Sequence, residues 1–478
     1  MENQHNPDNT IAAISTPPGV GGIAVIRISG DDAIKITEKI WRGKSPSEWL
    51  SHTAHLGSIV TPQGETIDNA VATVFHAPNS FTGESVVELS IHGSRWIQQQ
   101  VMNLLTENGA QPAGRGEFTQ RAFMNGRLDL AQAESIADLI AADSKAAHRL
   151  AMTQLKGTYS NRLKDLRNQL IEIASLMELE LDFSEEDVEF ADRKQLIEIT
   201  SEIENEVNKL AKSFRAGKVF KEGIPVVIAG VPNAGKSTLL NALVDDEKAI
   251  VTDIPGTTRD IIEETVELDG ILFRIFDTAG LRTTSDEVER IGVERTRKKV
   301  RESHILLWIE DPTQPLQPQQ NELTNTLSLL PPDTTILHIT SKNDLSTTPG
   351  NPSSCPNSPE KQISENRETA ELPVMCHLQI SAKTGTGIDT LKSNLVTQAT
   401  KGLDMSTDLM VTNARHYDSL TKAHTSILRI RDGLENGLSG DFIAQDIRET
   451  MHHFSSITGE ITTDTLLSTI FSRFCIGK

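Results

Sequence analysis

The chain has 478 residues, 37% hydrophobic and 23% charged, which is ordinary for a globular protein of about two to four domains. A formal net charge of −20 disfavours nucleic-acid binding by this chain alone, because affinity for phosphate backbones comes from clustered Lys and Arg. The apolar runs are far shorter than a membrane span and the polar N-terminus lacks a signal-peptide core, so we expect a cytoplasmic protein without membrane contact.

The first part of the chain, residues 1–120, alternates short apolar segments with Gly/Pro turns. Strands are predicted at 22–28, 70–75 and 86–91, and an amphipathic helix at 96–105. This pattern is typical of a compact α+β domain.

A helical domain with few Gly and Pro is predicted at residues 121–221, and helical character returns at 403–478. The segment between them, 222–402, alternates strands and helices, which predicts an inserted α/β domain and therefore a discontinuous helical domain. A polar tract at 345–372 predicts a long surface loop. Apolar residues at helical spacing are Leu163, Leu166, Leu170, Ile173, Leu176 and Leu179.

A phosphate-binding loop is predicted at Gly230-Val-Pro-Asn-Ala-Gly235-Lys236-Ser237, which fits G-x-x-x-x-G-K-[ST]. A predicted strand at 224–229 precedes it and a predicted helix at 238–243 follows, so the context favours a nucleotide site over an ordinary Gly-rich turn. The glycines let N–H groups curl around phosphates, Lys236 meets the β and γ charges, and the Ser237 hydroxyl binds Mg²⁺.

Two segments are predicted to sense the γ-phosphate. Asp277-Thr-Ala-Gly280 follows a predicted hairpin that turns at Asp269-Gly270, which places Asp277 at a strand end beside Mg²⁺. The segment 252–260 has the composition of a mobile switch, and we assign the second Mg²⁺ hydroxyl to Thr258.

Guanine recognition is predicted at Ser341-Lys-Asn-Asp344, where Asp344 can accept from the guanine N1 and N2 groups, a donor pattern that ATP lacks. The motif usually opens with Asn or Thr, and Ser341 is expected to keep guanine preference with altered affinity. A second segment, Ser381-Ala-Lys383 after a predicted strand at 378–380, is predicted to supply the last base contact. The expected GTP contacts are Asn233, Ala234, Gly235, Lys236, Ser237, Thr238, Thr252, Asp253, Ile254, Pro255, Gly256, Thr257, Thr258, Asp277, Thr278, Ala279, Gly280, Lys342, Asp344, Ser381, Ala382 and Lys383.

The residues alone leave the hydrolytic device open. Ras-like proteins orient water with a Gln after Asp-x-x-Gly, and Leu281 occupies that position. Arg259 and Arg282 are either arginine fingers or solvated loop charges, and Glu289 has the pattern of a solvated residue at a helix start.

Three cysteines without metal-ligand spacing argue against a disulfide framework, and Cys475, three residues from the chain end, is incidental by position alone. Arg27 and Glu88, on predicted strands, are surface or paired charges on the same grounds.

Further motifs are spread over nearly the whole chain. They are Thr16-Pro-Pro-Gly19, Ile26-Arg27-Ile-Ser-Gly30, Ser80-Phe-Thr-Gly-Glu84, Gly116-Glu-Phe-Thr119, Arg121-Ala-Phe123, Leu128-Asp-Leu-Ala-Gln-Ala-Glu134, Asp286-Glu-Val-Glu-Arg-Ile-Gly292 and Phe474-Cys475-Ile-Gly-Lys478. With these motifs the chain resembles the tRNA-modification GTPases called MnmE or TrmE. The resemblance implies an N-terminal α+β folate-binding domain, a discontinuous helical domain and an inserted Ras-like P-loop G domain.

The resemblance also implies how GTP is hydrolysed. A potassium ion replaces the arginine finger and neutralises charge that develops during phosphoryl transfer, in G domains that dimerise across their nucleotides. The water-orienting residue falls on Glu289. The implied potassium ligands are Asn233, Thr252, Ile254 and Thr257.

For the modification itself, the resemblance implies that Cys475 is essential and that 5-formyltetrahydrofolate or another tetrahydrofolate carries a one-carbon unit. The implied folate contacts are Arg27, Glu88, Arg127 and Lys478, and Arg127 replaces a Lys of relatives.

The implied function is to add a (carboxymethyl)aminomethyl group to C5 of the wobble uridine of certain tRNAs. The implied partners are a second copy of the chain, as a homodimer, and the FAD-dependent protein MnmG (GidA), in a heterotetramer or larger complex. The acidic charge suggests that tRNA is bound mainly by that partner. The alternative, a ribosome-assembly or regulatory GTPase, should carry a basic RNA-binding domain after the G domain, and this chain has none.

Overall fold

The computed structural model describes residues 9–182, 193–245, 263–277, 301, 303–331, 334–342, 344, 374–401 and 409–478. The chain divides into two compact units. The first comprises Met1–Ala141, Ala151–Ala211 and Ala414–Lys478, and the second comprises Ala142–Leu150 and Lys212–Asn413. The domain boundaries expected after residues 120, 221 and 402 stay predictions. Within the described part of the chain, no helix combines the length and apolar character needed to cross a membrane.

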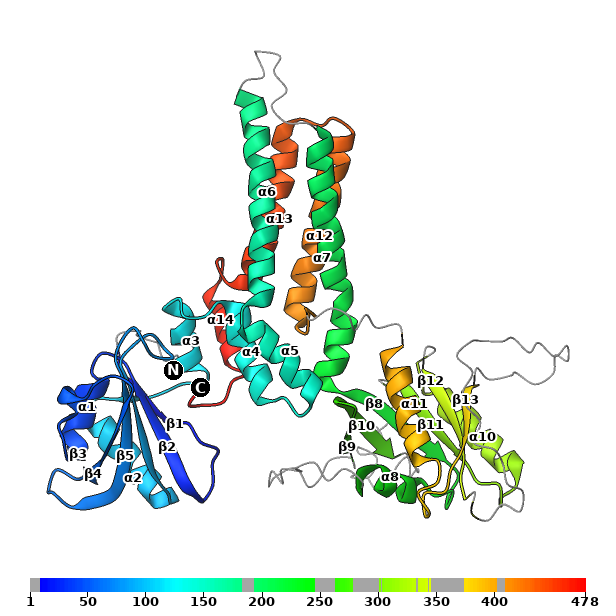
Figure 1. Cartoon of the computed structure of the whole chain (residues 1–478), viewed down its shortest axis with the longest axis horizontal. Helices are drawn as coiled ribbons and strands as arrows, with labels where there is room; N and C mark the ends of the chain where they lie inside the picture. The colour runs from blue at the N-terminus through cyan, green and yellow to red at the C-terminus, as the bar shows by residue number, and fades with distance from the viewer. Residues whose placement is uncertain are drawn as a thin grey trace. The chain divides into compact units, whose positions relative to one another are not determined.

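The first unit begins with the sheet that contains the blue strands of Figure 1. It has seven strands in the order β3-β4-β5-β6-β2-β1-β7. All pairs are antiparallel except β1 with β7. The strands are β1 (Ile11–Ile14), β2 (Gly21–Ser29), β3 (Trp41–Arg42), β4 (Thr53–Val60), β5 (Thr66–Phe75), β6 (Val86–Gly93) and β7 (Gln111–Pro112).

The strands predicted at 22–28, 70–75 and 86–91 are confirmed as parts of β2, β5 and β6. Alternation puts every second β5 residue on one face, where Ala70, Ala72 and Val74 are buried. That face packs in one core with apolar residues of the helices α1 (Ala33–Ile40) and α2 (Arg95–Glu107), and a short 3-10 turn, η1 (Pro46–Glu48), lies beside α1.

The rest of the first unit is helical, and its long helices stand side by side in Figure 1. In α6 the predicted spacing buries Leu163, Leu166, Leu170 and Ile173, but Met177 takes the next core position in place of Leu176, which is only half-buried. The helices are α3 (Glu117–Met124), α4 (Leu130–Ile140), α6 (Thr158–Asp182), α7 (Arg193–Glu222, as far as Ala211), α12 (Ala414–Glu435), α13 (Gly440–Thr458) and α14 (Asp464–Phe471).

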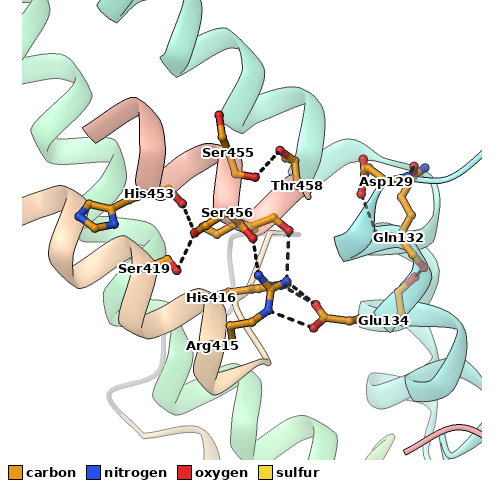
Figure 2. A network of polar contacts seen from close by, with 12 residues as sticks. Asp129, Gln132, Glu134, Arg415, His416, Ser419, His453, Ser455, Ser456 and Thr458 are labelled. Atoms are coloured by element: carbon orange, nitrogen blue, oxygen red, sulfur yellow. Dashed lines mark hydrogen bonds and ion pairs between the residues drawn. The ribbon is translucent and has the colours of Figure 1, made fainter. Parts of the chain in front are cut away.

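A buried polar cluster joins α4, α12 and the end of α13 (Figure 2). The Arg415 guanidinium donates to both Glu134 carboxylate oxygens, at 3.1 and 2.9 Å, and to the carbonyl of Ile457 at 3.1 Å. His416 Nε2 lies 2.7 Å from Glu134, and the His416 ring stacks on Tyr159 of α6. The Glu134 carboxylate therefore links α4 to residues 281 and 282 positions later in the chain.

The second unit contains a six-stranded sheet in the order β13-β12-β11-β8-β10-β9, parallel except for the β9–β10 hairpin. The hairpin turns at Asp269-Gly270 as predicted. The strands are β8 (Ile224–Gly230), β9 (Glu263–Leu268), β10 (Ile271–Asp277), β11 (Ile305–Glu310), β12 (Thr335–Thr340) and β13 (Val374–Gln379). The described helices are α8 (Lys236–Asp245), α10 (Leu316–Leu327), α11 (Ile388–Thr400), the part of α7 from Lys212 onward and the part of α5 (Lys145–Leu155) up to Leu150.

Candidate functional site

The predicted phosphate loop connects β8, which is buried along its whole length, to the start of α8. Gly230 closes the strand with φ 156°, and a Cβ there would stand 2.4 Å from the Ile309 carbonyl oxygen of β11. Asn233 and Gly235 have φ values of 63° and 100°. Positive φ at alternating positions curls a loop so that its N–H groups converge, which is the shape of an anion site.

Lys236 and the first turn of α8 complete this loop. The Lys236 ammonium donates to the carbonyls of Gly230 at 2.8 Å and Val231 at 3.0 Å, so its charge is held inside the loop. Ser237 and Thr238 are exposed, and the first turn of α8 contains no acidic residue. The positive end of the helix dipole is therefore not neutralised locally, which favours a phosphate there.

Asp277 ends β10 at the same edge of the sheet, since its backbone lies opposite Ile228 of β8. Its placement at a strand end agrees with the sequence prediction. The other predicted contacts of the two γ-phosphate segments lie outside the described residues, as do the predicted water-orienting residue Glu289 and the loop at 345–372. Those contacts are Thr252, Asp253, Ile254, Pro255, Gly256, Thr257, Thr258, Thr278, Ala279 and Gly280.

The two predicted guanine segments meet after β12 and β13. The Ser381 hydroxyl donates to Asp344 Oδ1 at 2.7 Å, which fixes the carboxylate expected to contact the base. Ser341 is buried, and its hydroxyl donates to the Glu310 carbonyl at 3.1 Å. Lys342 has a left-handed φ of 57° and pairs with a buried carboxylate, Asp311.

Sequence reasoning missed Asp311 and its neighbour Gln314, which lie between the phosphate loop and the guanine segments. Gln314 Nε2 donates to Asp311 Oδ2 at 2.8 Å and to the Pro232 carbonyl of the loop at 3.0 Å. The available signal was an Asp at the end of the strand 305–310, a position comparable to that of Asp277 at the end of β10.

In the first unit, the predicted folate residues Arg27 and Glu88 are paired across β2 and β6. Glu88 Oε1 accepts from Arg27 Nε and Nη2, both at 2.8 Å, and the two side chains are 27% and 22% exposed. The guanidinium lies 5.7 Å from the Phe81 ring centre and 5.6 Å from that of Phe118. The pair is thus a partly open, aromatic-flanked site, and the two phenylalanines were missed.

A second ionic group lies beside it. Arg121 donates to Glu84 at 3.1 Å and to Glu117 at 3.0 Å, with all three side chains at most 15% exposed. Ser29 of β2 donates to Glu84 at 2.6 Å. Arg127 lies at the same loop, since a Cβ on Gly83 would meet its Cγ at 3.3 Å. Glu84, Arg121 and Glu117 occur in the family motifs, but their spacing alone does not indicate contact.

The C-terminal tail docks onto this part of the first unit. The Ser15 hydroxyl, just after β1, donates to the Gly477 carbonyl at 3.0 Å, and Gly116 N donates to the Cys475 carbonyl at 3.4 Å. Cys475 itself is exposed. Ala13 of β1 lies opposite Arg27 of β2, two residues before Ser15, so the tail that carries Cys475 and Lys478 is held near the strand that carries the Arg27–Glu88 pair.

Parallel strands, a phosphate loop ahead of α8 and paired guanine segments define a P-loop nucleotide-binding protein of the G-domain class. The family description "MnmE helical domain" matches residues 130–475, and "GTP-binding protein TrmE N-terminus" matches residues 10–127. The chain belongs to the MnmE (TrmE) family.

Individual relatives are similar to this chain over nearly their full length. The tRNA modification GTPase MnmE of Parabacteroides distasonis is 47% identical over 475 residues, which cover 98% of this chain and 100% of that protein. The protein of the same name from Christiangramia forsetii is 44% identical over 482 residues, with 98% and 99% covered. Among solved structures, the G domain of the T. maritima FeoB iron transporter is 23% identical with a TM-score of 0.25, covering 37% of this chain and 98% of that one.

Proposed function

We propose that this chain is a GTPase that acts in tRNA modification, the activity that the names of its relatives state for those proteins. The observation that supports it most is the convergence of the phosphate loop, the end of β10 and the Ser381–Asp344 pair at the carboxyl edge of one parallel sheet. Nucleotides bind at this edge in open α/β sheets. Membership of the family over nearly the whole chain supports tRNA modification.

In this proposal the residues 233–238 bind the phosphates, Lys236 faces the β and γ charges, and Asp344 accepts from guanine. The Ser381 hydroxyl supports the guanine contact because it fixes one oxygen of that carboxylate. A base without N1 and N2 donors would leave this carboxylate unpaired, which favours guanine over adenine.

Two cations complete the proposal. Ser237 and Thr258 would hold Mg²⁺, and the exposed hydroxyl of Ser237 at the α8 start is an oxygen ligand of the kind that Mg²⁺ takes. A potassium ion would supply positive charge beside the phosphates during hydrolysis, while Glu289 orients the water. Its proposed ligands are Asn233, Thr252, Ile254 and Thr257.

The proposed modification site is the region around the Arg27–Glu88 pair. A carboxylate that accepts from amines, with the exposed ring of Phe81 beside the paired guanidinium, suits the pterin ring of a tetrahydrofolate. Arg127 and Lys478 would pair with the folate carboxylates. Bound folate would supply a one-carbon unit, and Cys475, exposed on the docked tail, would act on the wobble uridine.

The proposed assembly is a homodimer that works with an FAD-dependent partner of the MnmG kind. A net charge of −20 supports a division of labour in which that partner binds most of the tRNA. Measuring tRNA binding by each protein alone tests this division of labour, and equal affinities for tRNA would refute it.

Nucleoside mass spectrometry of tRNA from cells that lack this protein tests the function. We expect C5-aminomethyl-type uridines to vanish and to return with wild type, but not with Cys475→Ser or Asp277→Ala. Unchanged levels of these uridines in the deletion strain would refute the proposed role in tRNA modification. In a parallel assay of the purified protein, GTP hydrolysis should be faster in KCl than in NaCl of equal ionic strength, and equal rates would remove the potassium role.

A further inference from the structure

Asp311 occupies a position from which it can act on both halves of the nucleotide site. It follows β11 directly, and β11 lies between β8, which leads to the phosphate loop, and β12, which leads to the guanine segment. The register sets Ile309 beside Gly230 and Glu310 beside Thr340. Asp311, the first residue after the strand, therefore leaves the sheet between the phosphate loop and the guanine segment.

The Asp311 side chain is fully buried and completely hydrogen-bonded. Its Oδ2 accepts from Lys342 Nζ at 2.6 Å and from Gln314 at 2.8 Å, and its Oδ1 accepts from the Thr313 hydroxyl at 2.6 Å and the Thr313 amide at 3.0 Å. Burial by itself raises the pKa of Asp311, but these hydrogen bonds, led by that of Lys342, outweigh it and hold the pKa well below its usual range. The carboxylate is thus charged, and Lys342 is its only cationic partner in the described residues.

Gln314 extends this group to the phosphate loop. The two hydrogens of one amide nitrogen are both used, one on Asp311 and one on the Pro232 carbonyl at 3.0 Å. Pro232 directly precedes Asn233 in the loop. The turn itself is fixed by buried Gln319, which accepts from the Asp311 amide and donates to the Asp311 carbonyl, both at 2.9 Å.

We propose that Asp311 and Gln314 are positioning residues for the nucleotide, forming a bridge that sets Lys342 of the guanine segment and Pro232 of the phosphate loop relative to each other. The proposal rests on the proposed GTP binding. The buried Asp311 carboxylate holds the Lys342 ammonium in one position. The Gln314 amide, bound to the same carboxylate, also fixes the position of the Pro232 carbonyl in the loop. Base and phosphate contacts should then be energetically coupled through a group that touches neither.

The test is the dissociation rate of a fluorescent guanine nucleotide, mant-GDP, from the full-length protein. Gln314→Ala removes two hydrogen bonds, one of them to a carboxylate, and we expect dissociation to be about tenfold faster. Gln320→Ala is the matched control, since Gln320 lies on α10 with an exposed side chain, and it should release mant-GDP at the wild-type rate. The thermal unfolding midpoint of nucleotide-free Gln314→Ala should fall by only a few degrees relative to the control, which shows that the variant is folded.

Coupling is tested by a double-mutant cycle with Lys342→Met. If the bridge joins the two segments, the effects of Gln314→Ala and Lys342→Met on dissociation should deviate from additivity by about threefold or more. A wild-type protein that does not bind mant-GDP would remove the proposed function itself. If wild type binds but Gln314→Ala releases nucleotide like the control, or the two effects simply add, the bridge is refuted.

Discussion

Replacing Glu134 by Gln tests how much stability the cluster in Figure 2 gives to the helical part of the chain. The Glu134 side chain is 10% exposed and the Arg415 side chain 19%, so a neutral amide would remove the charge with which this guanidinium pairs in a largely buried position. Breaking a buried ion pair in this way costs about 3–5 kcal/mol. Burial by itself raises the pKa of Glu134, but the charges and hydrogen bonds of His416 and Arg415 lower it to about 2.

The lowered pKa of Glu134 gives a second value for the stability that its carboxylate contributes, and it predicts how this stability depends on pH. A shift from 4.5 to about 2 corresponds to about 3 kcal/mol of stability. Because the pKa in the folded state lies below the unfolded value, this stability is fully present above pH 4.5 and is lost as pH falls toward 2. The difference in unfolding free energy between wild type and Glu134→Gln should therefore be about 1 kcal/mol smaller at pH 3.5 than at pH 7.

Urea unfolding followed by circular dichroism at 222 nm measures this difference, since α6, α7, α12 and α13 contain about half of the helical residues in the described part of the chain. Glu449→Gln is the control, because Glu449 pairs with Arg429 of α12 in an exposed position, with side chains 47% and 45% exposed, and should cost at most about 1 kcal/mol. The reasoning fails if the two variants are equally stable at pH 7, or if the gap between wild type and Glu134→Gln is the same at both pH values.

Two further substitutions address the sites. Gly477 has φ 92°, and a Cβ there would stand 2.4 Å from the Ile14 carbonyl oxygen. Gly477→Ala should therefore dislodge the tail that carries Cys475, abolish uridine modification in cells and leave GTP hydrolysis unchanged. Full modification by this variant would contradict the docking argument. Ser381→Ala removes the hydrogen bond to Asp344, and we expect mant-GDP affinity in a fluorescence titration to fall about tenfold. Wild-type affinity would mean that Asp344 needs no such support.

Local sequence signals were sufficient for much of the second unit. The pair Asp269-Gly270 predicts a tight hairpin turn, and both residues adopt positive φ, 50° and 82°. The phosphate loop was predictable because glycines, lysine and flanking elements are contiguous in the sequence. Such features depend on interactions between near neighbours, which a sequence displays directly.

Features that depend on distant neighbours were not predictable. A lone Asp311 after an apolar strand shows its role only when Lys342 is placed beside it. The Glu134–Arg415 pair spans 281 positions, and no spacing rule connects α4 with α12. Even inside α6 the choice of Met177 over Leu176 depends on which side of the helix meets its neighbours, because adjacent residues point about 100° apart.

The position of Cys475 shows how the fold changes the meaning of a residue. By position in the sequence it lies at a chain end, where order is usually poor. Here the residue before it, Phe474, is buried in one apolar cluster with Leu130 of α4 and Phe471 of α14, and the residues after it are held by Ser15 and Arg115, across 462 positions for Ser15. The backbone on both sides of the cysteine is thus fixed while its thiol is exposed. A side chain that must act on an external base needs both properties, a defined position and an open approach, and this arrangement supports the proposed role of Cys475 more strongly than the motif alone.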